Sequence, residues 1–147
     1  MRSRFGDAVV SDGGVDRPAL ARLAFATPED RGWLEGLLWP RVRLRVRDWR
    51  AALERSPDRP RLAVVEVPLL FESGMEQAFD ATIAVVAAED VRAERAGARA
   101  HEALAARSAR QLSQEEKAHR ATYVVVNDGT VHDLESKLSD VLEMLGP

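Results

Sequence analysis

The chain has 147 residues and a formal net charge of −3 at pH 7, a length that suits one domain and a charge that argues against a general nucleic-acid surface. It contains no cysteine, which excludes disulfides and thiolate metal sites. No apolar run reaches the length of a membrane span, and the amino terminus lacks the apolar core of a signal peptide. We therefore expect a cytoplasmic protein that binds neither nucleic acid nor membrane.

Residues 1–60 carry the signals of helices. Asp16 follows the turn sequence Asp12-Gly13-Gly14 and is the predicted N-cap of a helix that continues to Phe25. A second helix is predicted from Thr27, whose hydroxyl can cap it ahead of a proline at the first helical position. Because Pro40 has no backbone N–H, we expect this second helix to bend or break there.

Three apolar runs of strand length follow a linker at residues 56–60. They span residues 62–67, 81–87 and 122–126. Apolar runs that do not alternate with polar residues suit strands covered on both faces of a parallel sheet. The charged segment 89–120 is predicted to be helical, and Thr130 is the predicted cap of a last helix with an apolar stripe. This alternation predicts an α/β layer architecture.

The stretch Val64-Val65-Glu66-Val67-Pro68-Leu69-Leu70-Phe71-Glu72 is the most distinctive of the chain. Its apolar run delivers Glu66 to the carboxyl edge of the predicted sheet, where α/β domains place nucleotides. A carboxylate there can hold Mg²⁺ or its water near a triphosphate, but strand-end acids that only face solvent are common. The loop that follows can contact a substrate or pack on neighbouring helices, and Glu72 alone carries little information.

Arginines recur at helical spacing in the segment 89–120. Arg95 and Arg99 lie four residues apart, and Arg107 and Arg110 lie three apart. Such a row can close over a polyphosphate through charge-assisted hydrogen bonds. On spacing alone, a solvated helix face in which glutamates alternate with arginines is the favoured alternative.

The loop Asn127-Asp128-Gly129 separates the last apolar run from the last helix. At the carboxyl end of a parallel strand, such a loop can present amide groups to a nucleotide base. The same residues are also ordinary turn formers, so the loop by itself does not decide between the two interpretations.

In their order, these passages resemble the dephospho-coenzyme A kinase family over nearly the whole chain. The motifs that carry the resemblance are Phe5-Gly6, Asp12-Gly13 with Val15-Asp16-Arg17, Leu34-Glu35 with Trp39-Pro40, the VPLLFE peptide at 67–72, Phe79-Asp80, the series Arg95, Arg99, Arg107 and Gln111, and Asn127 with Gly129. The resemblance implies ATP-dependent phosphorylation of the ribose 3′-hydroxyl of dephospho-coenzyme A, the last step of coenzyme A synthesis.

The fold class that the resemblance implies is α/β: an incomplete P-loop kinase-like parallel sheet flanked by helices, with a helical acceptor-binding region and a helical lid. The implied regions are residues 1–60 for the coenzyme A acceptor, 61–89 for core strands with the VPLLFE motif, 90–121 for the lid helices, and 122–147 for the last core strand and the C-terminal helix.

The resemblance also assigns candidate site residues and partners. The catalytic candidates are Glu66 and Arg107, the ATP-binding candidates are Arg107, Asn127 and Gly129, and the substrate-binding candidates are Asp16, Arg17, Pro68, Leu69, Leu70, Phe71 and Glu72. Glu66 is also the candidate ligand of Mg²⁺, acting indirectly. The implied partners are dephospho-coenzyme A and ATP.

The chain departs from the family pattern in one decisive respect. It contains no GxxxxGK(S/T) motif, whose backbone amides and lysine cradle phosphates, and it also lacks the acid that follows the family's second strand. Trp39 stands where the family usually has histidine. Because phosphoryl transfer depends on positioning and electrostatics, losing the phosphate cradle removes most of the catalysis.

We therefore expect an amino-terminally truncated kinase sequence that is inactive as it stands. ATP and Mg²⁺ binding are expected to be impaired, and exposed sheet edges are expected to favour self-association. Two alternatives stay open. The chain is a non-catalytic remnant that binds a coenzyme A-like ligand, or it is another small-molecule or nucleotide kinase.

Overall fold

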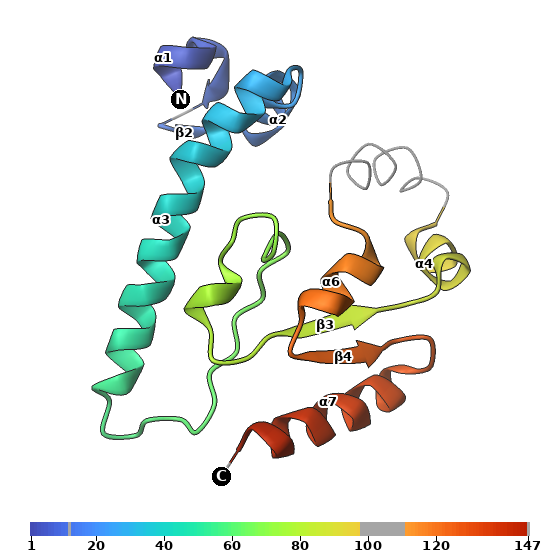
Figure 1. Ribbon diagram of the computed structural model, residues 1–147. Helices are drawn as coiled ribbons and strands as arrows, with labels where there is room; N and C mark the ends of the chain where they lie inside the picture. Colours follow the sequence, from blue (N-terminus) through green and yellow to red (C-terminus); the bar gives the residue numbers. More distant parts are fainter. Residues whose placement is uncertain (12, 98–110, 147) are drawn as a thin grey trace. The chain divides into compact units, whose positions relative to one another are not determined.

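The computed structural model describes residues 1–11, 13–97 and 111–146, which form two compact units (Figure 1). Unit 1 spans Met1–Arg59 and unit 2 spans Pro60–Pro147. Within the described residues, no helix combines the length and the apolar character needed to cross a bilayer.

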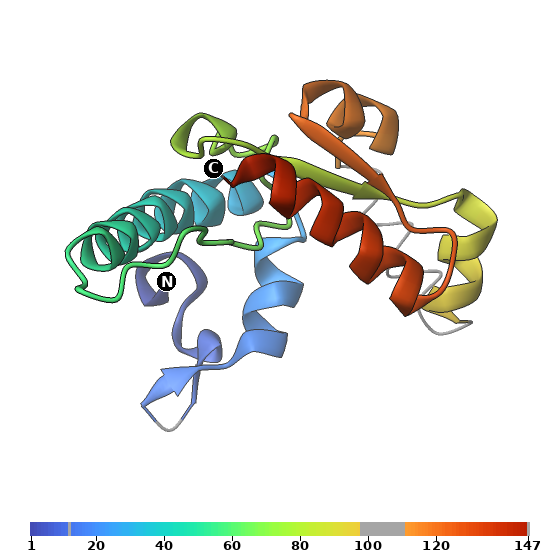
Figure 2. The same ribbon diagram turned by 90° about the horizontal axis from the view of Figure 1, so that it is seen from below.

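Unit 1 is mainly helical. Its elements are α1 (Arg2–Phe5), a 3-10 turn (Asp7–Val9), β1 (Val10–Ser11), β2 (Gly14–Val15), α2 (Arg17–Ala24) and α3 (Pro28–Glu54). The strands pair antiparallel with Val10 opposite Val15, in the hairpin drawn in blue in Figure 2. The sequence predicted a turn at this place but not the short strands on either side of it.

Both predicted helix starts in unit 1 are confirmed. The Asp16 carboxylate accepts a hydrogen bond from the Ala19 N–H at 2.9 Å at the start of α2. The Thr27 hydroxyl accepts one from the Asp30 N–H at 3.1 Å at the start of α3. Each side chain satisfies a backbone donor that has no partner inside its helix.

The break expected as one outcome at Pro40 is wrong, because α3 runs unbroken for 27 residues, and the bend stays a prediction. A proline inside a helix leaves the carbonyl four residues earlier without its donor. That carbonyl belongs to Gly36, which is exposed, so water can satisfy it. The Arg41 guanidinium also donates to the Leu37 carbonyl at 2.6 Å one residue further on, which strengthens the helix beside the proline.

A small apolar core holds unit 1 together. Its buried members are Val9, Leu20, Ala24 and Leu34. Phe5 and Trp33 pack against this cluster, with their rings edge to face and their centroids 5.5 Å apart. The core therefore joins the 3-10 turn, α2 and the first turns of α3 into one body.

Unit 2 contains the parallel sheet. Its elements are a 3-10 turn (Glu76–Ala78), β3 (Ile83–Val86), α4 (Glu89–Ala96), α6 (Gln114–Arg120), β4 (Tyr123–Val126) and α7 (Val131–Leu145). β3 and β4 pair in parallel, from Ile83 opposite Tyr123 to Val86 opposite Val126. α6 packs on β3 and α7 on β4 (Figure 1), so the predicted α/β architecture is confirmed.

The strand predicted at residues 62–67 does not form. The segment is irregular and pairs with no other strand of the described chain. A strand exists only where a second backbone accepts and donates its hydrogen bonds, and β3 pairs with β4 instead. Consistent with this, Val64 remains 67% exposed.

The two-stranded sheet is only partly covered. Ala84 and Val125 are buried, whereas their register partners Val124 and Val85 are 45% and 50% exposed. Register partners point to the same face of a sheet, so each face is covered over one strand and open over the other. The predicted covering of both faces is therefore incomplete, and the expected self-association stays a prediction.

We expect the Asp16 cap to contribute measurably to the stability of unit 1. Asp16→Ala removes the acceptor for the Ala19 N–H and should lower the free energy of unfolding by about 1 kcal/mol in urea titration. Asp16→Asn keeps an acceptor oxygen and should stay within about 0.5 kcal/mol of wild type. Equal losses in the two variants would contradict a capping role.

Candidate functional site

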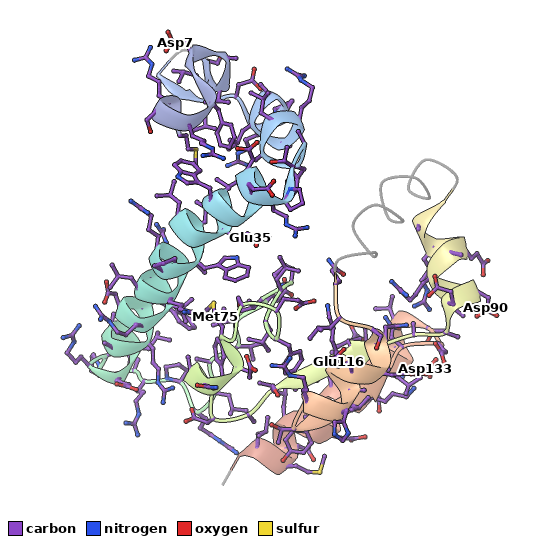
Figure 3. All side chains as sticks on the ribbon, turned by 45° about the horizontal axis from the view of Figure 1, so that its top comes forward. Asp7, Glu35, Met75, Asp90, Glu116 and Asp133 are labelled. Atoms are coloured by element: carbon purple, nitrogen blue, oxygen red, sulfur yellow. The ribbon has the colours of Figure 1, made fainter. Side chains whose placement is uncertain are left out.

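The VPLLFE peptide at 67–72 ends in a compact turn. The Met75 N–H donates to the Leu70 carbonyl at 3.0 Å, and Gly74 adopts a φ of 64°, a left-handed conformation that favours glycine. Phe71 and Met75 are 6% and 3% exposed, and Figure 3 labels Met75 on this turn. The end of the peptide therefore belongs to the interior of unit 2.

An ion pair fastens the turn to α6. The Lys117 ammonium lies 2.9 Å from Glu72 Oε1, and the same oxygen accepts a hydrogen bond from the Leu112 N–H at 3.1 Å. The Glu72 side chain is 12% exposed. The peptide is thereby tied both to α6 and to the residues that lead into it.

Arg120 supplies a second attachment, one turn further along α6. Its guanidinium donates to the Phe71 carbonyl at 3.3 Å, pairs with the Glu76 carboxylate and lies 5.2 Å from the centre of the Phe71 ring. A cation over an aromatic face is attracted by the ring quadrupole. Neither Lys117 nor Arg120 was predicted from the sequence as a site residue. Their spacing on α6, matched by Glu72 and Glu76, was the available signal.

The charge state of Glu72 follows from these contacts. Burial raises the pKa of the Glu72 carboxyl, but the hydrogen bonds from Lys117 and from backbone N–H groups outweigh burial. The pKa of Glu72 therefore lies below its ordinary value, and the carboxyl is ionised at neutral pH.

A pocket of about 200 Å³ lies beside the turn, entirely within unit 2. Its walls are formed by the VPLLFE peptide without Leu69, by β3, and by Gln114 and Lys117 of α6. Gln114 also holds the carboxyl end of β3, since its amide accepts from the Ala87 N–H at 3.0 Å and donates to the Ala87 carbonyl at 2.8 Å. α6 thus connects the pocket to the edge of the sheet where nucleotides bind in α/β folds.

The loop from Asn127 to Gly129 lies at the same edge. Asn127 extends the ladder, with its N–H donating to the Val86 carbonyl at 2.7 Å. Arg95 of α4 donates to the carbonyls of Asn127 and Gly129, each at 2.7 Å. The loop is therefore a fixed structure and not a free turn.

Gly129 has a packing reason to be glycine. A Cβ at this position would lie 2.6 Å from Asp133 Oδ2, closer than real Cβ contacts. That carboxylate accepts from the Thr130 N–H at 2.8 Å and completes the predicted cap of α7 (Asp133 is labelled in Figure 3). The hydrogen bonds to Thr130 lower the pKa of Asp133, so the cap is ionised at neutral pH.

The other predicted site residues do not form one cluster in the structure. Asp16 and Arg17 lie in unit 1, where Asp16 caps α2 and Arg17 is exposed. Glu66 lies in unit 2 and is exposed, just before the turn. Arg99 and Arg107 fall outside the described residues. Among the residues that the structure does describe, no cluster of three or more metal-ligating side chains occurs.

The ion pair between Glu72 and Lys117 predicts a pH-dependent stability. Lys117→Met should lower the free energy of unfolding by about 2 kcal/mol at pH 7. Because the folded-state pKa of Glu72 is depressed, the pair stabilises above the unfolded pKa of about 4.3 and is lost as pH falls through the lower folded value. In urea titrations at several pH values, the difference from wild type should shrink in acid.

The matched control is Glu116→Gln, which removes an exposed carboxylate from the same helix. It should change the free energy of unfolding by less than about 0.5 kcal/mol. A deficit in Lys117→Met that is the same at every pH would show that lost packing, and not the ion pair, explains it.

The chain is similar to proteins of one family along its length. A family model described as dephospho-CoA kinase matches residues 1–133. A dephospho-CoA kinase of Deinococcus radiodurans is 41% identical over 140 residues, which are 93% of this chain and 67% of that protein. One of Thermus thermophilus is 39% identical over 148 residues, 99% of this chain and 70% of that protein.

Two solved structures are also similar to this chain. The crystal structure of a Thermus thermophilus protein matches with a TM-score of 0.71 at 40% identity, covering 99% of this chain and 75% of that one. A dephospho-CoA kinase of Campylobacter jejuni matches in fold, with a TM-score of 0.67 at 23% identity over 99% of this chain and 73% of that one. The chain belongs to the dephospho-CoA kinase family.

Proposed function

We propose that this chain carries the acceptor-binding, lid and base-binding parts of a dephospho-CoA kinase, which transfers a phosphoryl group from ATP to the ribose 3′-hydroxyl of dephospho-CoA. One observation carries the proposal. α6 holds the VPLLFE turn beside a pocket that runs along β3, and the carboxyl end of the same strand is bonded to Asn127. The family match over residues 1–133 favours this acceptor over that of another small-molecule or nucleotide kinase.

Each part has a role in the proposed reaction. The acceptor-contact candidates of unit 1 are Asp16 and Arg17, and those of unit 2 are Pro68, Leu69 and Leu70. Phe71 and Glu72, which are bonded to α6, support the peptide from inside unit 2. Asn127 and Gly129 are the adenine-contact candidates. Arg107 neutralises ATP phosphates. Glu66, an exposed carboxylate, is the kind of ligand that Mg²⁺ takes alongside phosphate oxygens and water, and the ion would neutralise charge on the transferring phosphoryl group.

The 147 residues contain no GxxxxGK(S/T) motif, and their two lysines, Lys117 and Lys137, are both engaged. Lys117 pairs with Glu72, and Lys137 donates to the Val126 carbonyl at 2.7 Å. The P-loop lysine of a kinase must instead reach the β- and γ-phosphates. We infer that these residues alone bind ATP and Mg²⁺ poorly and do not support turnover.

The test is an assay of the purified chain with ATP, Mg²⁺ and dephospho-CoA, following formation of coenzyme A. We expect no product above background, because the positioning of the phosphates supplies most of the catalysis in this reaction. The dephospho-CoA kinase of Thermus thermophilus, assayed in parallel, is the positive control. Robust turnover by the 147-residue chain would refute the proposed inactivity.

A second candidate is binding of a coenzyme A-like ligand without catalysis. The core of unit 1, formed by Val9, Leu20, Ala24 and Leu34, favours it, because a region with its own core can fold around an acceptor. Calorimetry with dephospho-CoA should then give a micromolar dissociation constant. Arg17→Ala should weaken binding about tenfold by removing a cation from the phosphates, whereas Arg22→Ala, on the same helix, should not. An absence of binding would rule this candidate out.

A further inference from the structure

Arg95 stands in the last turn of α4 and bridges the loop from Asn127 to Gly129. Its Nη1 donates to the Asn127 carbonyl and its Nη2 to the Gly129 carbonyl, each at 2.7 Å. The planar guanidinium thereby spans two acceptors of one loop, a geometry that a lysine cannot reproduce. Both terminal nitrogens of Arg95 are engaged with the backbone of this loop.

The other end of α4 is attached to the same loop. Asp128 Oδ1 accepts a hydrogen bond from the N–H of Ala88 at 2.7 Å, and Ala88 is the N-cap residue of α4. A carboxylate at the amino end of a helix is favoured by the helix dipole. The loop therefore contacts both ends of α4, through pairs of residues 32 to 40 positions apart in the sequence.

The sheet and α7 hold the flanks of the loop, and α4 holds its middle. Asn127 N–H bonds to the Val86 carbonyl on one flank, and the Thr130 cap begins α7 on the other. Between them, the carbonyls of Asn127 and Gly129 have Arg95 as their cationic partner. Among the hydrogen bonds of the described residues, only the one from the Ala88 N–H to Asp128 would still join the middle of the loop to α4 if Arg95 were removed.

We propose that Arg95 is a positioning residue, which fixes the base-binding loop, and not a ligand of the ATP phosphates. The proposal rests on the proposed function of this loop in contacting adenine. It assigns Arg95 a different role from the phosphate-binding row that its spacing with Arg99 allows. Arg95 then acts on every ligand that carries an adenine base, with or without phosphates.

The structure offers a matched control on the same helix. Arg92 lies three residues before Arg95 and pairs with Glu89 within α4. Arg92→Ala therefore removes the same charge from α4 without touching the loop. Arg95→Lys keeps the charge but cannot span both carbonyls, so it separates the effect of charge from that of geometry.

The first measurement is backbone amide hydrogen exchange, which needs no ligand. In Arg95→Ala we expect the Ala88 amide, which bonds to Asp128, and the Asn127 amide, which bonds to Val86, to exchange about tenfold faster than in wild type. Arg95→Lys should show most of this increase, and Arg92→Ala none of it. Unchanged exchange in Arg95→Ala would overturn the positioning role.

The second measurement compares adenosine with ATP by NMR titration. A positioning role predicts the same loss of affinity, about tenfold, for both ligands in Arg95→Ala. A phosphate ligand predicts a loss for ATP and an unchanged affinity for adenosine, and this result would overturn the proposal. If wild type binds neither ligand, the proposed base site fails, while hydrogen exchange still decides whether Arg95 positions the loop.

Discussion

The parallel ladder between β3 and β4 is the interaction on which unit 2 depends. Its backbone bonds continue beyond the strands, from the Tyr123 N–H to the Thr82 carbonyl at 2.9 Å and from the Asn127 N–H to the Val86 carbonyl at 2.7 Å. At the start of the ladder, Thr82 and Thr122 exchange hydrogen bonds between the hydroxyl of one and the N–H of the other, each at 3.1 Å. Because the strands are parallel, their carboxyl ends meet at one edge, and the loop from Asn127 to Gly129 forms there.

Local physical chemistry explains which parts of the fold the sequence could predict. Asp16, Thr27 and Thr130 act on N–H groups three residues away, so their neighbours in the sequence suffice to identify three helix starts. The prediction of a strand at residues 62–67 was wrong because a strand also needs the backbone of a distant segment as its partner, and no local pattern reveals that partner. The break predicted at Pro40 was wrong for the opposite reason, because the other hydrogen bonds of a 27-residue helix outweigh one missing bond.

The residues of the candidate site also fall into two groups: those recognisable from a local motif and those that act on distant segments. The VPLLFE peptide and the loop at Asn127 could be located from their motifs, but their supports could not. Gln114 and Arg95 contact partners that lie 27 and 32 positions away, where spacing carries no signal. Lys117 contacts Glu72, for which the matching spacing of charges on α6 was the one available signal. The sequence therefore identified the peptides of the site, and the structure identified the helices α4 and α6 that hold them.

The close approach of Gly129 to Asp133 changes what the motif of asparagine and glycine can be taken to mean. A side chain at position 129 would displace the carboxylate that starts α7, before any nucleotide arrives. The glycine thus leaves room for the carboxylate half of the α7 capping box, independently of ligand binding. The motif is therefore evidence of the capped start of α7 as much as of a base-binding site.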